Sequence, residues 1–116
     1  MKKISAENLG LAVGSYLETE LVPKSNGIQK VGLYLAIPLM QGKAQDLCRQ
    51  YAPALEFMEC LEEDGLLNLD SLHKQFKAAV GKAGKVSLLG IVFDEDDVEK
   101  VYTAALPYAQ GGVNGV

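Results

Sequence analysis

The run "VGLYLAIPLM", residues 31–40, is the longest apolar stretch of the chain, and the fold depends on it. Few of its residues are β-branched, which favours a helix over a strand. Apolar side chains recur at the spacing of an α-helix, at Ile28, Val31, Leu35 and Leu39. Both faces of such a helix are apolar beyond Val31, so we expect residues 28–41 to be largely buried. Other helices, or a second copy of the chain, must cover them.

Two prolines interrupt the expected helices, one inside this run and one after it. Pro38 removes one backbone hydrogen bond and clashes with the carbonyl of Tyr34, which predicts a kink or a break there, and Gly42 is a second weak point. A further helix is expected over 43–61, with an apolar stripe at Leu47, Tyr51, Leu55, Met58 and Leu61. Pro53 is expected to kink this helix or to begin its second half.

A helix over residues 6–21 is expected before the central run, with Ser5 as its N-cap. Gly10 and Gly14 lie four residues apart in it. Each glycine costs close to 1 kcal/mol in a helix interior. Their pairing on one face therefore predicts the close approach of another helix. The turn residues of "PKSNG", 23–27, end the segment.

The stretch "EEDGLLNLDSLHKQF", residues 62–76, resembles half of a calcium loop. If Gly65 took the sixth position of an EF-hand, Cys60 and Ser71 would take the first and twelfth, and neither supplies a carboxylate. We therefore interpret Asp64-Gly65 as a turn, residues 66–69 as a short strand and Asp70 as the cap of a helix that follows it.

The same order of strand, aspartate and helix returns near the C-terminus. "KVSLLGIVF", residues 85–93, is the strongest strand candidate, and Asp94 is expected to cap a helix that Pro107 ends. Acidic residues 94–97 stabilise the start of a helix, so we do not interpret them as a metal site. The strands 66–69 and 86–92 could pair as a ribbon, which must lie against the helices or another chain.

These elements predict a mainly α protein. We expect a small helical bundle of four to five helices with a minor two-stranded β ribbon in the C-terminal half. The chain of 116 residues suits one domain, placed at 1–106, with a Gly-rich C-terminal tail at 107–116.

Charge and composition argue against several partners and locations. The net charge is −4 and the basic residues are dispersed, so neither nucleic acid nor an anionic membrane surface is an expected partner. No apolar segment follows "MKK", and residues 31–40 are about half the length that spans a bilayer. We therefore expect a cytoplasmic protein.

The sequence predicts no catalytic, cofactor-binding or metal-binding residues. Cys48 and Cys60 form no CxxC pair and are expected to be small apolar side chains in a reducing compartment. His73, the single histidine, is expected to be exposed and inert. "GKAGKVS", residues 81–87, lacks the spacing of a phosphate-binding loop.

The leading hypothesis is a non-enzymatic interaction or assembly module whose partner is a protein, with self-association expected. Its candidate surface comprises Leu33, Tyr34, Ile37, Met40 and Tyr51. The alternative is a small-molecule-binding protein or enzyme whose pocket is lined by tyrosines, Tyr34 and Tyr51 among them, and by carboxylates. No segment resembles a specific family, although the ending "FDEDDVEKVY" resembles small accessory proteins of bacterial or prophage gene clusters.

Overall fold

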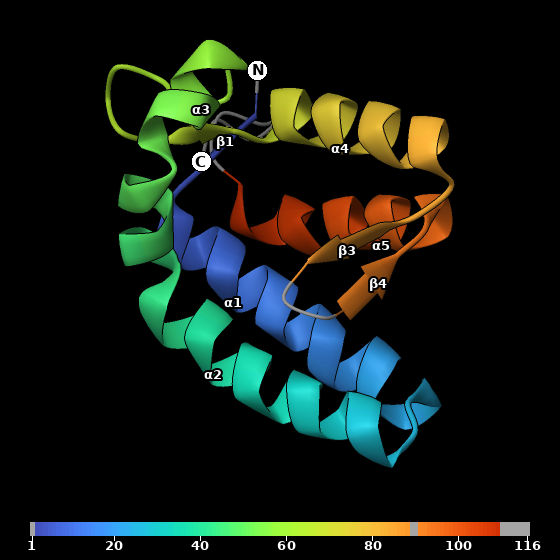
Figure 1. Cartoon of the computed structure of the whole chain (residues 1–116). Coiled ribbons are helices and arrows are strands. Elements are labelled where there is room, and N and C mark those ends of the chain that lie inside the picture. The colour runs from blue at the N-terminus through green and yellow to red at the C-terminus, as the bar shows by residue number, and fades with distance from the viewer. Residues whose placement is uncertain (1, 89–90, 110–116) are drawn as a thin grey trace.

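The computed structural model describes residues 2–88 and 91–109 and confirms a mainly α bundle (Figure 1). Five α-helices follow one another as α1 (Ala6–Tyr16), α2 (Gly27–Gln50), α3 (Ala52–Phe57), α4 (Leu69–Ala83) and α5 (Glu95–Ala105). The strands are β1 (Lys3–Ile4), β2 (Leu67–Asn68), β3 (Val86–Leu88) and β4 (Ile91–Phe93). Shorter helical turns are η1 (Leu17–Leu21), η2 (Val22–Lys24) and η3 (Leu106–Tyr108). The predicted tail lies outside the described residues from position 110 onward.

The two glycines of α1 allow α2 to pack closely against it, as predicted. A Cβ atom at Gly10 would overlap the backbone carbonyl oxygen of Met40 and would lie 2.5 Å from the Cβ of Ala44. At Gly14 it would lie 2.7 Å from the Cγ of Gln41. α1 and α2 therefore lie side by side along their length (Figure 1). The close approach compensates for the low helix propensity of both glycines.

One continuous helix, α2, replaces the two that were predicted to meet near Gly42. Asn26 caps the start of α2. The Asn26 side chain accepts a hydrogen bond from the backbone N–H of Gln29, and the Gln29 side chain accepts one from the backbone N–H of Asn26. Pro38 lies inside the helix without ending it, and α2 curves along α1 (Figure 1). The break falls at Tyr51 instead, and Pro53 occupies the first turn of α3, as one of the two predicted alternatives required.

Side-chain caps also fix the starts of α1, α4 and α5, with one correction. Ser5 caps α1 and Asp94 caps α5, both as predicted. The cap of α4 is Asn68, whose Oδ1 accepts from the backbone N–H of Ser71 at 3.0 Å. Asp70 lies in the first turn of α4 instead and accepts from the backbone N–H of Lys2 and the hydroxyl of Tyr102. Gly65 has φ +83°, as its predicted turn requires.

The predicted pairing of strands 66–69 and 86–92 is wrong. β2 pairs antiparallel with β1, which places Ile4 opposite Leu67. The predicted second strand divides into β3 and β4, which pair antiparallel with each other and place Val86 opposite Phe93. Each ribbon has two strands and lies beside helices, because such short pairs need packing to be stable.

The core forms two clusters. One joins α1 and η1 to the inner face of α2 and contains Tyr16, Leu17, Leu33, Ala36 and Ile37. The other joins the β1–β2 ribbon to α1, α4 and α5 and contains Ile4, Ala12, Leu67, Leu69 and Ala105. α1 contributes to both, so it is the central helix of the fold.

A partly buried hydrogen bond between α1 and α5 makes the stability sensitive to alkaline pH. The hydroxyl of Tyr16 donates to Oδ1 of Asp97 at 2.5 Å. Burial, together with this hydrogen bond and the charge of Asp97, raises the pKa of Tyr16 far above its ordinary value. The folded protein therefore keeps a proton that the unfolded chain releases above about pH 10.

We expect the free energy of unfolding to fall above pH 10, with Tyr16 contributing up to about 1.4 kcal/mol per pH unit. Below pH 10 the tyrosine is protonated in both states and contributes no slope. Urea titrations between pH 8 and pH 11 measure the effect. Tyr16→Phe should show a weaker alkaline slope, whereas Tyr51→Phe, at an exposed position, should match the wild type. Equal slopes in all three proteins would contradict the assignment.

Candidate functional site

The outer face of α2 carries an exposed apolar stripe. Ile28 is 87% exposed, Leu35 is 72% exposed, and Val31 between them is also exposed. Leu39 continues the stripe and is half-buried. These four residues, here called the outer α2 face, extend about 16 Å along the helix. They were predicted to be buried, and the structure leaves Ile28, Val31 and Leu35 uncovered in a single chain.

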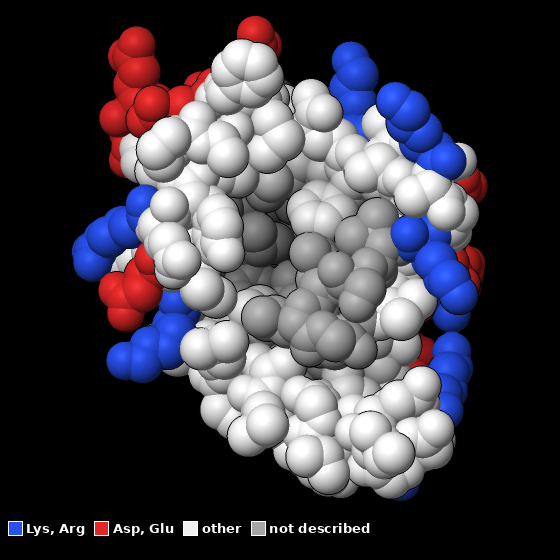
Figure 2. Space-filling model, in the orientation of Figure 1, with Lys and Arg blue, Asp and Glu red and all other residues white. Residues whose placement is uncertain are grey.

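One side of α2 is buried and the other is exposed, although both sides are apolar. Leu33, Ala36 and Ile37 form its buried side, against α1 and η1. No charged residue lies between Lys30 and Lys43, so the outer side lacks the polar residues that usually face water. Figure 2 shows a broad uncharged surface over the first half of α2, at the bottom of the view.

The five residues of the predicted interaction surface do not form one surface. Leu33 is 2% exposed and Ile37 is also buried, so both belong to the core. Met40 is partly buried beside the same core cluster. Tyr34 and Tyr51 are exposed, at 60% and 57%. Tyr34 borders the outer α2 face, while Tyr51 lies at the junction of α2 and α3.

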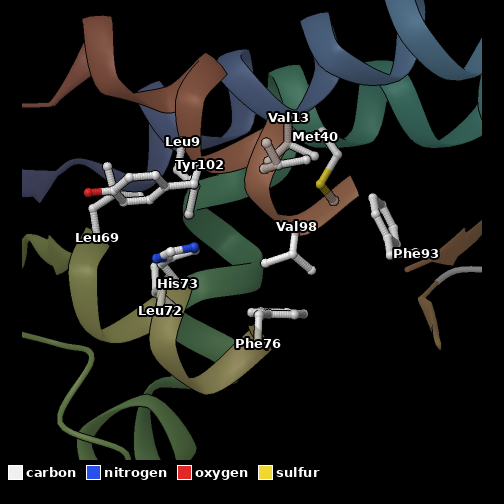
Figure 3. Close-up of a pocket in the computed structure, with 11 residues that line it drawn as sticks. Leu9, Val13, Met40, Leu69, Leu72, His73, Phe76, Phe93, Val98 and Tyr102 are labelled. Carbon is white, nitrogen blue, oxygen red and sulfur yellow. The ribbon is translucent and has the colours of Figure 1, made fainter. Parts of the chain in front are cut away.

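An apolar cavity of about 240 Å³ lies between α1, α4 and α5 (Figure 3). Figure 2 shows the surface hollowed near the middle of the view. α4 and α5 supply most of the described lining, and α1, α2 and β4 complete it. The lining residues are Leu9, Val13, Met40, Leu69, Leu72, His73, Phe76, Phe93, Val98, Val101 and Tyr102. Neither Tyr34 nor Tyr51 is among them, and no carboxylate is, so this is not the pocket that the alternative hypothesis described.

His73 is part of the cavity wall, which corrects the expectation that it is exposed. Its ring stacks on Tyr102, with the ring centres 4.1 Å apart (Figure 3). Its Nε2 lies 3.0 Å from Oε1 of Glu99. The Nζ of Lys77 forms a salt bridge with the same oxygen, also at 3.0 Å. An ionised carboxylate only accepts hydrogen bonds, so Nε2 is the nitrogen that carries the proton.

The acids beside this wall are stabilised in their charged forms. The Lys77 ammonium and the His73 ring hold the pKa of Glu99 below its ordinary value. Burial opposes the ionisation of Asp70, but hydrogen bonds from Tyr102 and the Lys2 backbone outweigh it and lower its pKa. The hydrogen bond to Asp70, aided by burial, raises the pKa of Tyr102. Each polar side chain of the wall is therefore paired with an acid that stays ionised at neutral pH.

A second, more open hollow is lined in part by Tyr16, Glu20 and Glu99, and the other described residues offer little for chemistry. Burial raises the pKa of the Cys48 and Cys60 thiols, which disfavours the reactive thiolate in both. Within residues 2–88 and 91–109, no three histidine, cysteine or acidic residues gather where they could hold a metal ion. None of the described helices combines the length and apolar character that crossing a membrane requires.

The site thus consists of two apolar features, the outer α2 face and the cavity between α1, α4 and α5. Searches against protein-family models, curated proteins and solved structures found no match for this chain.

Proposed function

We propose that this protein is a non-enzymatic assembly module that associates with itself through the outer α2 face. The observation that carries the proposal is the exposure of Ile28, Val31 and Leu35 on a helix with no charged residue for twelve positions. Large contiguous apolar patches are uncommon on monomeric proteins and usually mark an interaction site. Each of these side chains gains a favourable transfer free energy when a partner covers it.

A second copy of the chain is the partner that the pattern fits best. A twofold axis brings the same patch of both subunits together, so the patch must complement itself. An apolar stripe without charge meets this condition, because pairing two copies places no like charges against each other. A strongly charged partner would instead require opposite charges on this face, and the sequence has none between Lys30 and Lys43.

The residue sizes favour an antiparallel pairing centred on Leu35. In that register Val31 of one copy faces Leu39 of the other, and Ile28 faces Gly42. Ile28 is the most exposed residue of the stripe, and Gly42 has open space where its side chain would be. A large side chain thus enters the gap above a glycine at both ends of the contact, as in the packing of knobs into holes.

Light scattering coupled to size-exclusion chromatography tests this proposal. The wild type should change with concentration from the 12.5 kDa monomer towards a dimer of twice that mass. Leu35→Glu places two carboxylates against each other at the twofold axis and should remain a monomer at every concentration tested. The position is 72% exposed, so the variant should keep its fold.

Phe57→Glu is the matched control, because Phe57 is an apolar residue of α3 that is 90% exposed and lies outside the outer α2 face. It should dimerise as the wild type does. A wild type that stays monomeric up to millimolar concentration, or a Leu35→Glu variant that dimerises normally, would exclude self-association through this face.

A further inference from the structure

The cavity between α1, α4 and α5 is a separate feature from the outer α2 face. Its described lining is almost wholly aliphatic and aromatic. In Figure 3, Phe93 lies on one side, and His73 and Tyr102 lie on the other. A preformed apolar hollow with a few polar groups at its edge is the usual form of a small-molecule site.

The polar groups of the wall are already paired, which restricts the ligand. The hydroxyl of Tyr102 donates to Asp70 at 2.8 Å, and Nε2 of His73 is paired with Glu99 at 3.0 Å. A ligand that needed several strong hydrogen bonds would have to break these pairs. A hydrocarbon group requires none and fills a space that water occupies poorly.

Size and charge restrict the ligand further. A volume of about 240 Å³ accommodates about eight carbon atoms, if each methylene group takes roughly the 30 Å³ that a water molecule occupies in the liquid. Asp70 and Glu99 lie just behind the two polar side chains of the wall, where Lys77 pairs with Glu99 and Lys2 lies near Asp70, so the positive charges there are already paired with these acids. A carboxylate head group would lose water and approach these acids, so a neutral head group is favoured.

We infer that the cavity binds an uncharged, mainly hydrocarbon molecule of about eight carbon atoms with a polar group no larger than a hydroxyl. The inference does not depend on self-association, because no residue of the outer α2 face lines the cavity. The ligand would contact Val98 and Phe76, the first on the α5 wall and the second at the partly exposed edge of α4.

Isothermal titration calorimetry with octan-1-ol and octanoate tests the inference on the full chain. Octan-1-ol should bind one site per chain with a dissociation constant on the order of 100 µM. Octanoate has the same number of carbon atoms but a charged head group, and it should bind at least about 10-fold more weakly.

Two variants locate the site. Val98→Phe adds a ring to the cavity wall and should weaken octan-1-ol binding at least about 10-fold. Val92→Phe makes the same exchange at an exposed position of β4, and its affinity should stay within about twofold of the wild type. Circular dichroism checks the fold of each variant. If Val98→Phe does not fold, Phe76→Trp at the cavity edge replaces it, with the same expected loss.

Four results would overturn the inference: no saturable binding of octan-1-ol, equal binding of octanoate, unchanged affinity of the cavity variant, or an equal loss in Val92→Phe. Because all of them are readable in a monomer, they are independent of the dimerisation experiment. Performing the titrations on Leu35→Glu separates the two proposals completely.

Discussion

Gly10→Ala should lower the free energy of unfolding by about 3 kcal/mol, because it has the closest Cβ contact among the described glycines. The added Cβ would overlap the carbonyl oxygen of Met40 and press on Ala44, and both belong to α2. A backbone carbonyl cannot turn aside as a flexible side chain can, so α1 and α2 would have to separate. That movement would loosen the core cluster formed by Tyr16, Leu17 and Leu33.

Two other glycines of the bundle serve as comparisons for Gly10. Gly14→Ala meets the Gln41 side chain, which can move, so a loss of about 1 kcal/mol is expected. Gly32→Ala meets nothing within 4 Å and should gain about 0.5–1 kcal/mol from helix propensity. Urea titrations at low protein concentration measure all three. A Gly10→Ala variant as stable as the wild type would show that α1 and α2 do not approach so closely.

Leu33→Ala should cost about 3 kcal/mol of stability, whereas Leu35→Ala should change it by less than about 0.5 kcal/mol. The two leucines are separated by one residue on α2 and differ in burial alone: Leu33 is 2% exposed and Leu35 is 72% exposed. Truncating Leu33 leaves a cavity beside Tyr16 and Leu17, and truncating Leu35 removes atoms that already contact water.

The same two variants distinguish effects on folding stability from effects on dimerisation. Leu33→Ala should still dimerise under conditions in which it is folded, and Leu35→Ala should dimerise more weakly while keeping wild-type stability as a monomer. Chemical denaturation gives the first quantity, and light scattering gives the second. If Leu35→Ala were the more destabilised variant, α2 would face α1 with its other side.

The sequence predicted the existence of most helices because local signals specify them. Ser5 and Asp94 both cap the helices that were expected to follow them, and Gly10 and Gly14 mark the contact with a second helix. These residues act through neighbouring backbone groups or through a missing side chain. Such effects can be recognised without knowing the tertiary structure.

The orientation of α2 could not be predicted in this way. Its stripe at Ile28, Val31 and Leu35 has the regular spacing of a buried face, yet Leu33 and Ile37 are the residues that pack on α1. Periodicity identifies one face only when the opposite face is polar, and residues 31–42 contain no charge on either side. The closeness of α1, which its glycines permit, determines which side is covered.

The strand partners and the cavity also depend on distant contacts. β1 consists of Lys3 and Ile4 alone and is too short to give a recognisable sequence pattern. Its partner β2 lies more than 60 residues later in the sequence, at Leu67 and Asn68. The spacing of Leu69, Leu72, His73 and Phe76 is that of a core-facing helix stripe. It is the same whether the facing helices meet or leave a hollow between them.

Methyl resonances recorded over a dilution series test the central claim, that the outer α2 face packs against a second copy, most directly. Between 1 mM and 10 µM, the methyl signals of Ile28, Val31, Leu35 and Leu39 should shift with a common dissociation constant. Those of the buried residues Ile4, Leu17 and Val80 should stay in place. Concentration-independent signals on α2, or shifts confined to another surface, would contradict the account.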